Sequence, residues 1–477
     1  MKIVVCVKQV PGTNAVHLDP DTGTLIREAR HAIINPFDAF AVEQAVRLQE
    51  KYGGETIVLS MGIPATEKIL RDVLSRGIDQ AVLLTDSAFA GADTWATAYT
   101  LSAAIHKIGS VDLVLCGRMA IDGDTAQTGP ELAECLGFVP LTDVSEVRER
   151  SAGKLTVRQN IEGGYRDLAV SLPALLTIAK DACKPRLPSI HSIVQSRGKP
   201  LLFWTADDLA LDKQLIGRPG SPTRVVETTT PVLKKETITL SDDVKELACL
   251  LRKELMDGPG HALPMHHAEH AEKENHPAGA KKIGTGKGAS VMMATADALQ
   301  PGGIWVFAET VNQQIHPVVF ELLSCARHLA DQPAGKQVTV VLCGSSAGLL
   351  AGSLVANGAD NILLCDDAAV NGQPQDICTE LITRLVRQYK PDIFLFGATA
   401  YGRAVAPRLA ARLQTGLTAD CTQLRLQEET GLLLQTRPAF GGNMLATIVT
   451  DRHRPQMATV RPGVMKPASE QPVRHGC

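Results

Sequence analysis

The loop Gly117–Pro130 combines glycines, hydroxyl groups and two carboxylates directly after an apolar run. A turn between a strand and a helix presents free backbone N–H groups and the positive end of the helix dipole, which suit phosphate groups. The hydroxyls of Thr125 and Thr128 add donors, and Asp122 and Asp124 suit loop ordering or contact with a ribose. The candidate binding residues here are Gly117, Arg118, Met119, Ala120, Ile121, Asp122, Gly123, Asp124, Thr125, Ala126, Gln127 and Thr128. A simpler interpretation, in which Asp122 and Thr125 only cap the following helix, fits the spacing equally well.

Three further segments could complete such a site. Asn35-Pro36-Phe37-Asp38 precedes a helical pattern, although a plain N-cap and lead-in turn is its simpler interpretation. Cys6 and Met61 each end an apolar strand. A small residue and a soft apolar residue suit the walls of a purine pocket, and both also suit an ordinary core.

The elements that must position these residues alternate along the chain. Short β-branched runs are separated by longer helical patterns, which is typical of parallel strands covered on both faces. The predicted strands are Ile3–Val7, Glu55–Ser60, Ala81–Leu84, Asp112–Cys116, Ile304–Ala308, Val338–Leu342, Asn361–Leu364 and Asp392–Phe396. The predicted helices are Ala39–Lys51, Ala65–Arg76, Val319–Ala330 and Glu380–Tyr389.

This pattern occurs twice, in two halves that can be aligned. Helix-terminal glycines, a strand-ending glycine and a late Gly-Gly turn recur in the same order, which chance rarely produces. The aligned segments are Val111–Gly117 with Pro391–Gly397, Pro130–Ala133 with Pro407–Ala410, and Gly163–Gly164 with Gly441–Gly442. The sequence therefore predicts an α/β fold of two homologous doubly wound parallel-sheet domains in tandem, at 1–257 and 303–477, joined by a flexible linker at 258–302.

We expect one nucleotide site per chain. The equivalent loop of the second half, Gly397–Arg403, is shorter and lacks both carboxylates, so its site should be altered or closed. The linker segment Gly284–Gly288 does not meet the spacing of a P-loop, and no strand precedes it. Histidines of the linker, including His266 and His270, have no fixed scaffold or cysteine beside them, so a solvated linker is expected and no metal site.

Composition excludes several classes of protein. Lysines and arginines total 48 against 51 acidic residues, and only 4% of residues are aromatic, which gives no field or stacking surface for nucleic acid. The 11 cysteines contain no C-x-x-C pair, which argues against structural zinc and indicates a reducing compartment. Glycines interrupt the uncharged stretch Val338–Ala359, and the N-terminus begins as a strand and not as a secretory signal. We therefore expect no membrane insertion and a cytoplasmic location.

The first half, over about residues 1–250, resembles the β subunit of electron transfer flavoproteins. The matching motifs are Cys6–Pro11, Asn35–Asp38, Ala120–Pro130, Gly163–Gly164, Lys184–Arg186 and Trp204–Leu209. Residues 303–467 resemble the N-terminal domain of the α subunit, through Ile304–Glu309, Gly416–Cys421, Arg437–Asn443 and Pro455–Gly463. The chain is thus similar to a natural β–α fusion.

The resemblance implies an electron carrier that takes electrons from a dehydrogenase or NADH and passes them to another flavoprotein or a quinone oxidoreductase. In that family the β domain has an adenine-nucleotide-hydrolase-like fold and binds either a structural AMP or, in the electron-bifurcating branch, FAD near an NADH site. By position, the contacts would come from Cys6, Asn35–Asp38, Met61 and Gly117–Thr128. The form of Asp122–Gln127 is more similar to the branch that uses FAD and NADH. The oxidoreductase chemistry would then belong to the flavin.

Two alternatives stay open at this point. The family's α subunit continues into a separate domain that binds the main FAD, whereas 12 residues follow Met465 here. We expect that another polypeptide supplies that domain, or that the protein works with the nucleotide of its β-like half. The alternative function is a non-redox, AMP-binding scaffold for a partner that carries the flavin domain.

Overall fold

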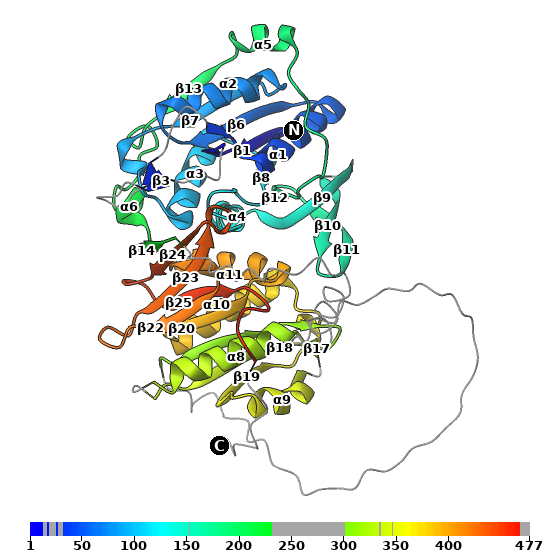
Figure 1. The fold of residues 1–477 in the computed structure, drawn as a ribbon. Helices are drawn as coiled ribbons and strands as arrows, with labels where there is room; N and C mark the ends of the chain where they lie inside the picture. The colour runs from blue at the N-terminus through cyan, green and yellow to red at the C-terminus, as the bar shows by residue number, and fades with distance from the viewer. Residues whose placement is uncertain are drawn as a thin grey trace, which may run out of the picture. The chain divides into compact units, whose positions relative to one another are not determined.

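The computed structural model describes residues 1–12, 17–18, 25–26, 32–151, 153–230, 301–332, 335–345 and 347–467 (Figure 1). The described residues up to Thr230 and those from 301 onward belong to one compact unit. The predicted linker at 258–302, with its histidines and the segment Gly284–Gly288, lies outside the described residues apart from positions 301 and 302. The predicted domain boundaries therefore stay predictions.

The first half is built on one large sheet, whose order among the described strands is β11-β10-β9-β12-β8-β1-β6-β7-β13. Its strands are β1 (Lys2–Cys6), β6 (Glu55–Met61), β7 (Gln80–Leu84), β8 (Leu113–Gly117), β9 (Val139–Ser151), β10 (Lys154–Ile161), β11 (Gly164–Ser171), β12 (Ala174–Ile178) and β13 (Leu201–Trp204). β1 pairs in parallel with β6 on one side and with β8 on the other. The strand order therefore reverses between β1 and β8, where open α/β sheets bind ligands.

Helices cover both faces of this sheet. They are α1 (Pro36–Tyr52), α2 (Glu67–Ser75), α3 (Thr94–Ile108) and α4 (Thr128–Leu136), with the short α5 (Ile190–Ser196) and α6 (Gly217–Gly220) later in the chain. Because successive side chains of a strand point to opposite faces, Ile3 and Val5 pack with α1 and α2, whereas Val4 and Cys6 pack with α3 and α4. Pro36 in its first turn starts α1, and Gly53 with a φ of 68° ends it.

The second half repeats this topology. Its parallel sheet has the order β19-β18-β15-β20-β25-β21 among the described strands, which places β15 as the first half places β1. The strands are β15 (Ile304–Ala308), β18 (Val338–Cys343), β19 (Asn361–Cys365), β20 (Ile393–Gly397), β21 (Leu417–Cys421) and β25 (Gln456–Val460). The helices are α8 (Pro317–Ala330), α9 (Ala351–Ala356), α10 (Gln375–Tyr389) and α11 (Ala400–Leu413).

An antiparallel sheet joins the end of the first half to the second. Its described strands have the order β14-β24-β23-β22, with β14 (Arg224–Thr229), β22 (Gln423–Leu426), β23 (Leu433–Ala439) and β24 (Met444–Val449). Two-stranded ribbons are β2 (Gln9–Pro11) with β5 (Ala32–Ile34), β3 (His17–Leu18) with β4 (Leu25–Ile26), and β16 (Thr310–Val311) with β17 (Gln314–Ile315). The 3₁₀ helices are η2 (Pro64–Thr66), η3 (Ser87–Phe89), η5 (Ala347–Leu350), η6 (Ala368–Val370) and η7 (Phe440–Gly442).

The predicted fold class is confirmed. Each of the predicted strands lies within one residue of an observed strand at its start, and the stretch Val338–Ala359 divides into β18, η5 and α9. Three of the four predicted helices start late, since α1 begins at Pro36, α8 at Pro317 and α10 at Gln375. The helix predicted from Ala65 starts early instead, because the 3₁₀ helix η2 precedes α2. No helix in the described part of the chain is long and apolar enough to cross a membrane.

Candidate functional site

The topology brings the predicted segments to the carboxyl edge of the first sheet. Cys6 ends β1, and Met61 and Gly117 end the strands on either side of it. Cys6 is the register partner of Leu59 on β6 and of Cys116 on β8. The residues that sequence spacing could only place at strand ends therefore lie beside the reversal of strand order.

Asn35 holds the loop that follows β8. Its side chain is fully buried, its Nδ2 donates to the carbonyl of Met119 over 2.8 Å, and its Oδ1 accepts from the N–H of Ile121 over 3.3 Å. It makes no side-chain capping bond to α1. The simpler N-cap interpretation therefore does not describe this side chain, which instead fixes the backbone of the candidate loop.

Asp38 ties two further segments to the same point. One carboxylate oxygen accepts from the N–H of Lys8 over 2.7 Å, and the other accepts from the N–H of Gly117 over 3.1 Å. Burial raises the pKa of Asp38 to about 7, against the lowering effect of these bonds and of the Lys8 charge. The carboxyl group is thus a buried crosslink between the ends of β1 and β8.

Gly117 has to be a glycine because α1 approaches it closely. A Cβ built at this position would lie 2.6 Å from the carbonyl carbon of Phe37 and 2.7 Å from the nitrogen of Asp38. Both neighbours are backbone atoms and cannot rotate away. The contact fixes the start of the loop against the first turn of α1.

The loop itself is ordered by its own carboxylates. The ammonium group of Lys8 lies 2.7 Å from Asp122, and the N–H of Gly123 donates to Asp122 Oδ1 over 2.8 Å. Asp124 and Ala126 adopt left-handed backbone angles, with φ of 50° and 55°, which non-glycine residues rarely do. Among the described residues, no side chain caps the start of α4, so the N–H groups of its first turn have no side-chain acceptor there. The interpretation of Asp122 as a helix cap is not what the structure shows.

Residues of the second half also reach this loop. The N–H of Phe440 donates to the carbonyl of Asp122 over 3.2 Å, and Gln127 Nε2 donates to the carbonyl of Leu417 over 2.9 Å. Asp124 lies close to Arg437, and its carboxylate accepts a hydrogen bond from the N–H of Gly441. Burial raises the pKa of Asp124, and the charge of Arg437 opposes that rise.

Arg437 is a functional candidate that sequence reasoning missed. Its side chain is 4% exposed, yet Nε and Nη2 have no hydrogen-bond partner among the described residues. Burial lowers the pKa of Arg437, because a guanidinium buried without partners loses its hydration. The signal was present in the motif Arg437–Asn443, to which the sequence alone gave no role.

Further arginines surround the same point. The carboxylate of Asp420 pairs with the guanidinium groups of Arg403 and Arg461, each over 3.1 Å. These arginines hold the pKa of Asp420 below its usual range despite burial. Arg118 pairs with Asp143 over 3.4 Å. With Arg437 added, four arginines lie around the loop, against Asp143, Asp420 and the loop's own Asp122 and Asp124.

The thiols of Cys6 and Cys116 lie at the carboxyl ends of β1 and β8. Cys6 and Cys116 are both buried, and the hydrogen bond between them, together with burial, raises the pKa of Cys116 well above its usual value. A thiol held in its neutral form is a poor nucleophile and a good apolar wall. The role of Cys6 as a wall of a purine pocket stays a prediction.

At the carboxyl edge of the second parallel sheet, side chains of the second half bond to the strand ends. Gln373 Nε2 donates to the carbonyls of Ala308 and Cys343 over 2.8 Å and 3.1 Å, and its Oε1 accepts from the N–H of Thr310. The hydroxyl of Thr399 donates to Glu309 over 2.6 Å. These bonds favour a single ligand site, in the first half.

The comparisons with known proteins give the family. The family model described as the electron transfer flavoprotein domain matches residues 22–209 and 304–476, which is more than half of the chain. The chain belongs to the electron transfer flavoprotein domain family.

Its relatives match the N-terminal half. The electron transfer flavoprotein subunit beta of Thermoanaerobacterium thermosaccharolyticum is 49% identical over 247 residues, which cover 52% of this chain and 94% of that protein. The caffeyl-CoA reductase-Etf complex subunit CarD of Acetobacterium woodii is 45% identical, over 49% of this chain and 89% of that protein. The acryloyl-CoA reductase electron transfer subunit gamma of Anaerotignum propionicum is 41% identical, over 52% of this chain and 94% of that protein.

The resemblance stated from the motifs is therefore confirmed. The first half is similar to the β subunit of electron transfer flavoproteins, and the second matched region agrees with a fusion to the N-terminal domain of the α subunit. The family supports an electron-transfer role for the chain.

Proposed function

We propose that this electron transfer flavoprotein carries electrons between a dehydrogenase or NADH and a flavoprotein or quinone acceptor, through FAD bound at the carboxyl edge of its first sheet. The observation that carries the proposal is the buried guanidinium of Arg437, whose unpartnered donors lie beside the loop Gly117–Thr128. An anionic cofactor would supply the missing acceptors. The family is associated with flavin, which supports FAD as that group.

The residues present fit a dinucleotide. The backbone N–H groups of Thr125–Thr128 and the first turn of α4 would hold its phosphates, and Asp122 or Asp124 would accept from a ribose hydroxyl. Cys6 and Met61 would contact the adenine, while Asn35–Asp38 would keep the loop in place. When bound, the flavin accepts an electron pair as a hydride and passes electrons on, and the protein sets its position and potential.

The arginines around the loop would act in two ways. Arg437, Arg403 and Arg461 stabilise negative charge near the loop, and this stabilisation is strong because Arg437 is shielded from water. The unpartnered donors of Arg437 would also bind an anionic group of a donor such as NADH.

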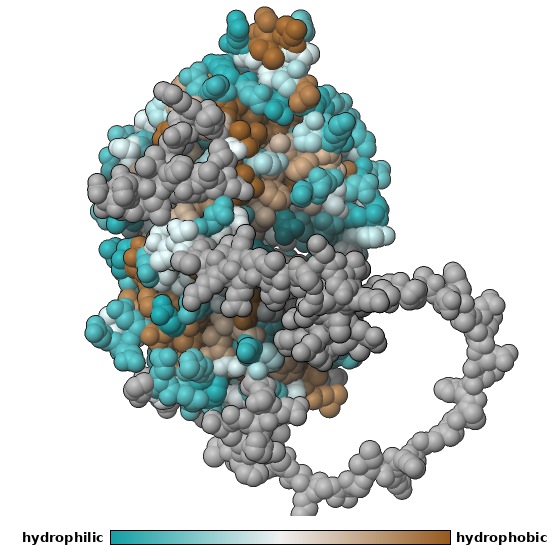
Figure 2. All heavy atoms as spheres, in the orientation of Figure 1, coloured by the Kyte–Doolittle hydropathy of each residue, from teal (hydrophilic) through white to brown (hydrophobic). Residues whose placement is uncertain are grey.

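A partner protein would dock on α5. Leu187, Ile190 and Val194 are 87%, 84% and 56% exposed, which leaves a small apolar group in solvent. Figure 2 shows this group at the top of the view, over α5. One relative is named as a subunit of a caffeyl-CoA reductase-Etf complex and another as an acryloyl-CoA reductase electron transfer subunit, so a dehydrogenase or reductase of that kind is the proposed partner.

The first experiment is to record the visible spectrum of the purified protein and to identify the ligand released by heat by its mass. FAD in a one-to-one ratio that bleaches on addition of NADH supports the proposal. A colourless protein that yields AMP contradicts it and supports the non-redox scaffold.

Replacing Arg437 separates ligand binding from folding. Arg437→Met should weaken cofactor affinity at least about tenfold, because charge-assisted hydrogen bonds contribute about 1.5–3 kcal/mol. The stability of the cofactor-free protein should change little, since the variant removes the desolvation cost of the buried Arg437 together with its attraction to Asp124 and Asp420. Arg425→Met, at an exposed position on β22, is the matched control. Unchanged affinity in Arg437→Met would show that this side chain does not face the cofactor.

A further inference from the structure

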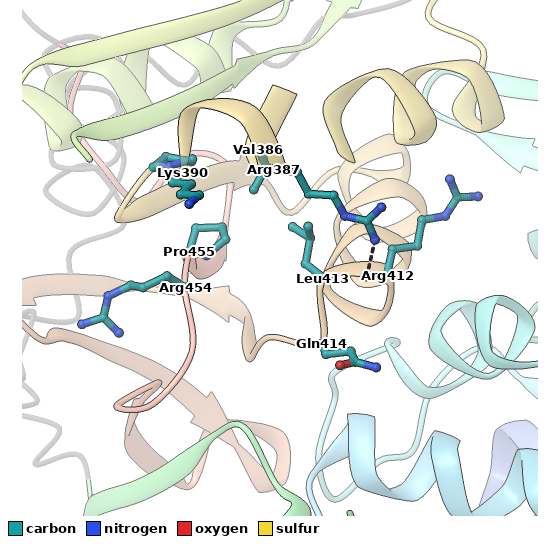
Figure 3. Close-up of a pocket in the computed structure, with 9 residues that line it drawn as sticks. Val386, Arg387, Lys390, Arg412, Leu413, Gln414, Arg454 and Pro455 are labelled. Carbon is teal, nitrogen blue, oxygen red and sulfur yellow. Dashed lines mark hydrogen bonds between the residues drawn. The ribbon is translucent and has the colours of Figure 1, made fainter. Parts of the chain in front are cut away.

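A pocket of about 530 Å³ lies at the amino edge of the second parallel sheet. It is formed where α10 and α11 end and where the chain enters β20 and β25 (Figure 3). Because parallel strands all begin at this edge, the pocket lies at the opposite end of the second sheet from the edge bridged by Gln373. It shares no lining residue with the proposed cofactor site.

All the ionisable side chains that line this pocket are cationic. They are Arg387, Lys390, Arg412 and Arg454. Aliphatic surface from Val386, Leu413 and two prolines lies between them. More of the lining is polar than apolar, which suits a charged ligand better than an apolar one.

One of these cations is already neutralised. Arg412 Nε donates to Glu134 over 2.7 Å, and its Nη1 donates to Glu380 over 2.8 Å. Figure 3 shows its guanidinium directed away from the other labelled side chains. Arg412 therefore shapes the pocket without offering its charge to a ligand.

The other cations keep their charge available. Arg387 makes a 3.3 Å bond to the carbonyl of Arg412, and Arg454 donates to the carbonyls of Thr450 and His453. Carbonyl acceptors do not neutralise a guanidinium. The ammonium group of Lys390 has no hydrogen bond or ion pair with any residue in the described ranges, although its backbone bonds to Val386 and Gly302.

Helix capping explains only part of this arrangement. Cations near the C-terminus of a helix are stabilised by its dipole and by its free carbonyls, which accounts for Arg387 and Lys390. Arg454 belongs to no helix, because it lies in the turn before β25. Its presence beside the helix ends adds positive charge that the helix dipoles do not require.

We propose that this pocket binds an organic phosphate with at least two anionic groups. Lys390 would hold one group, and Arg387, on the other side of Pro455 in Figure 3, would hold the second. Figure 3 shows the guanidinium of Arg454 directed away from Pro455, so Arg454 would join Lys390 through a change of side-chain rotamer. Guanidinium groups match phosphate oxygens in pairs, and the ammonium group adds a point charge. Val386 and Leu413 would contact the apolar part of the ligand. This site is independent of the proposed electron-transfer function.

The test is calorimetric titration of the full chain with inorganic pyrophosphate and with ADP as probes. The double variant Lys390→Gln, Arg454→Gln should weaken pyrophosphate binding at least about a hundredfold, or about tenfold for each cation lost. Arg425→Gln removes one exposed charge outside the pocket and should leave the affinity unchanged. An equal loss in Arg425→Gln would show that only net charge matters, and would overturn the proposal.

A second variant separates this pocket from the cofactor site. Gly117→Ala disturbs the first-half loop and should keep pyrophosphate binding in the pocket. If Gly117→Ala abolishes pyrophosphate binding and the double variant does not, the phosphate site lies in the first half and the proposal fails. Binding of a glutamate-rich peptide in the absence of any pyrophosphate binding would also overturn it, in favour of an acidic protein segment.

Discussion

At the residue scale, buried side chains fix the backbone of the candidate site through hydrogen bonds. Asp38 and Asn35 are buried, and their hydrogen bonds fix Lys8, Gly117, Met119 and Ile121. An unpaired buried polar group is costly, so each of these side chains needs its backbone partners. The loop is therefore held in one conformation before any ligand is present.

Gly117→Ala tests the close approach of the loop and α1. We expect the added methyl group to displace backbone, to cost about 1–3 kcal/mol of unfolding free energy and to reduce the cofactor content of the purified protein. The measurements are denaturant unfolding and the ratio of released cofactor to protein. Gly164→Ala, where an added Cβ meets no atom within 4 Å, is the control and should change neither quantity. Normal cofactor content in Gly117→Ala would contradict the tight contact.

Asp38 makes stability depend on pH in a defined window. Its pKa of about 7 in the folded state lies above the value of about 3.9 for an unfolded chain, so the folded state binds the proton more tightly. Stability from this group is complete below about pH 4 and is lost as the pH rises toward 7, by up to about 1.4 kcal/mol per unit.

Asp38→Asn isolates that contribution, because asparagine does not titrate. The difference in unfolding free energy between the natural protein and Asp38→Asn should shrink as the pH rises from about 4.5 to 6.5. Denaturant titrations at several pH values measure it. A difference that stays constant with pH would show that Asp38 is ionised in the folded protein throughout this range.

At the scale of elements, α5 differs from the helices that cover the sheets. α1 and α2 bury one face in the core, whereas α5 leaves Ile190 and Val194 in solvent. Its seven residues give too little buried surface to require these apolar side chains for folding. Partner binding is the proposed reason for their presence.

Leu187→Ser with Ile190→Ser tests this surface. We expect KM for a dehydrogenase that reduces the protein to rise at least about tenfold, since each exposed apolar side chain contributes about 1–2 kcal/mol when a partner buries it. Cofactor content and unfolding temperature should not change. Leu349→Ser, at a residue in the second half that is also 87% exposed, should leave KM as it is. A drop in unfolding temperature for the double variant would mean that the patch is structural.

At the scale of the whole chain, the two halves meet through buried charges. Glu134 of α4 accepts from Arg408 and Arg412 of α11 over 2.6 Å and 2.7 Å, and the side chain of Arg408 is 4% exposed. Gln127 and Asp122 add hydrogen bonds from the candidate loop to the second half. The site is therefore completed by residues far apart in the sequence.

Glu134→Ala should destabilise the contact between α4 and α11 by about 1.5–3 kcal/mol, because Arg408 and Arg412 each lose one carboxylate and keep the other, at Asp376 and Glu380. Denaturant unfolding measures the change. Asp207→Asn removes a pair with Lys213 that is exposed on both sides, and should cost less than about 0.5 kcal/mol. Equal effects of the two variants would show that the contact between the halves contributes little.

The sequence by itself determined the strands, the repeat and the family. Apolar runs such as Ile304–Ala308 are too short for a typical helix, which favours buried strands, and a strand-ending glycine such as Gly117 recurs as Gly397, so these features follow from local patterns. The motif around Asp122–Thr128 is also contiguous, which let its place at a helix start be predicted from spacing. Which of these residues contact a cofactor stays a prediction.

The residues that surround this loop come from remote segments, so they are known only from the tertiary structure. Arg437 is more than 300 residues away from Asp124 along the chain, and a hydrophobic pattern carries no signal for such a pair. Asn35 could be distinguished from a helix cap only by its bonds to Met119 and Ile121. Burial and pairing depend on how remote segments pack, so the charge state of Asp38 and the unpartnered donors of Arg437 follow from the fold and not from any local stretch of sequence.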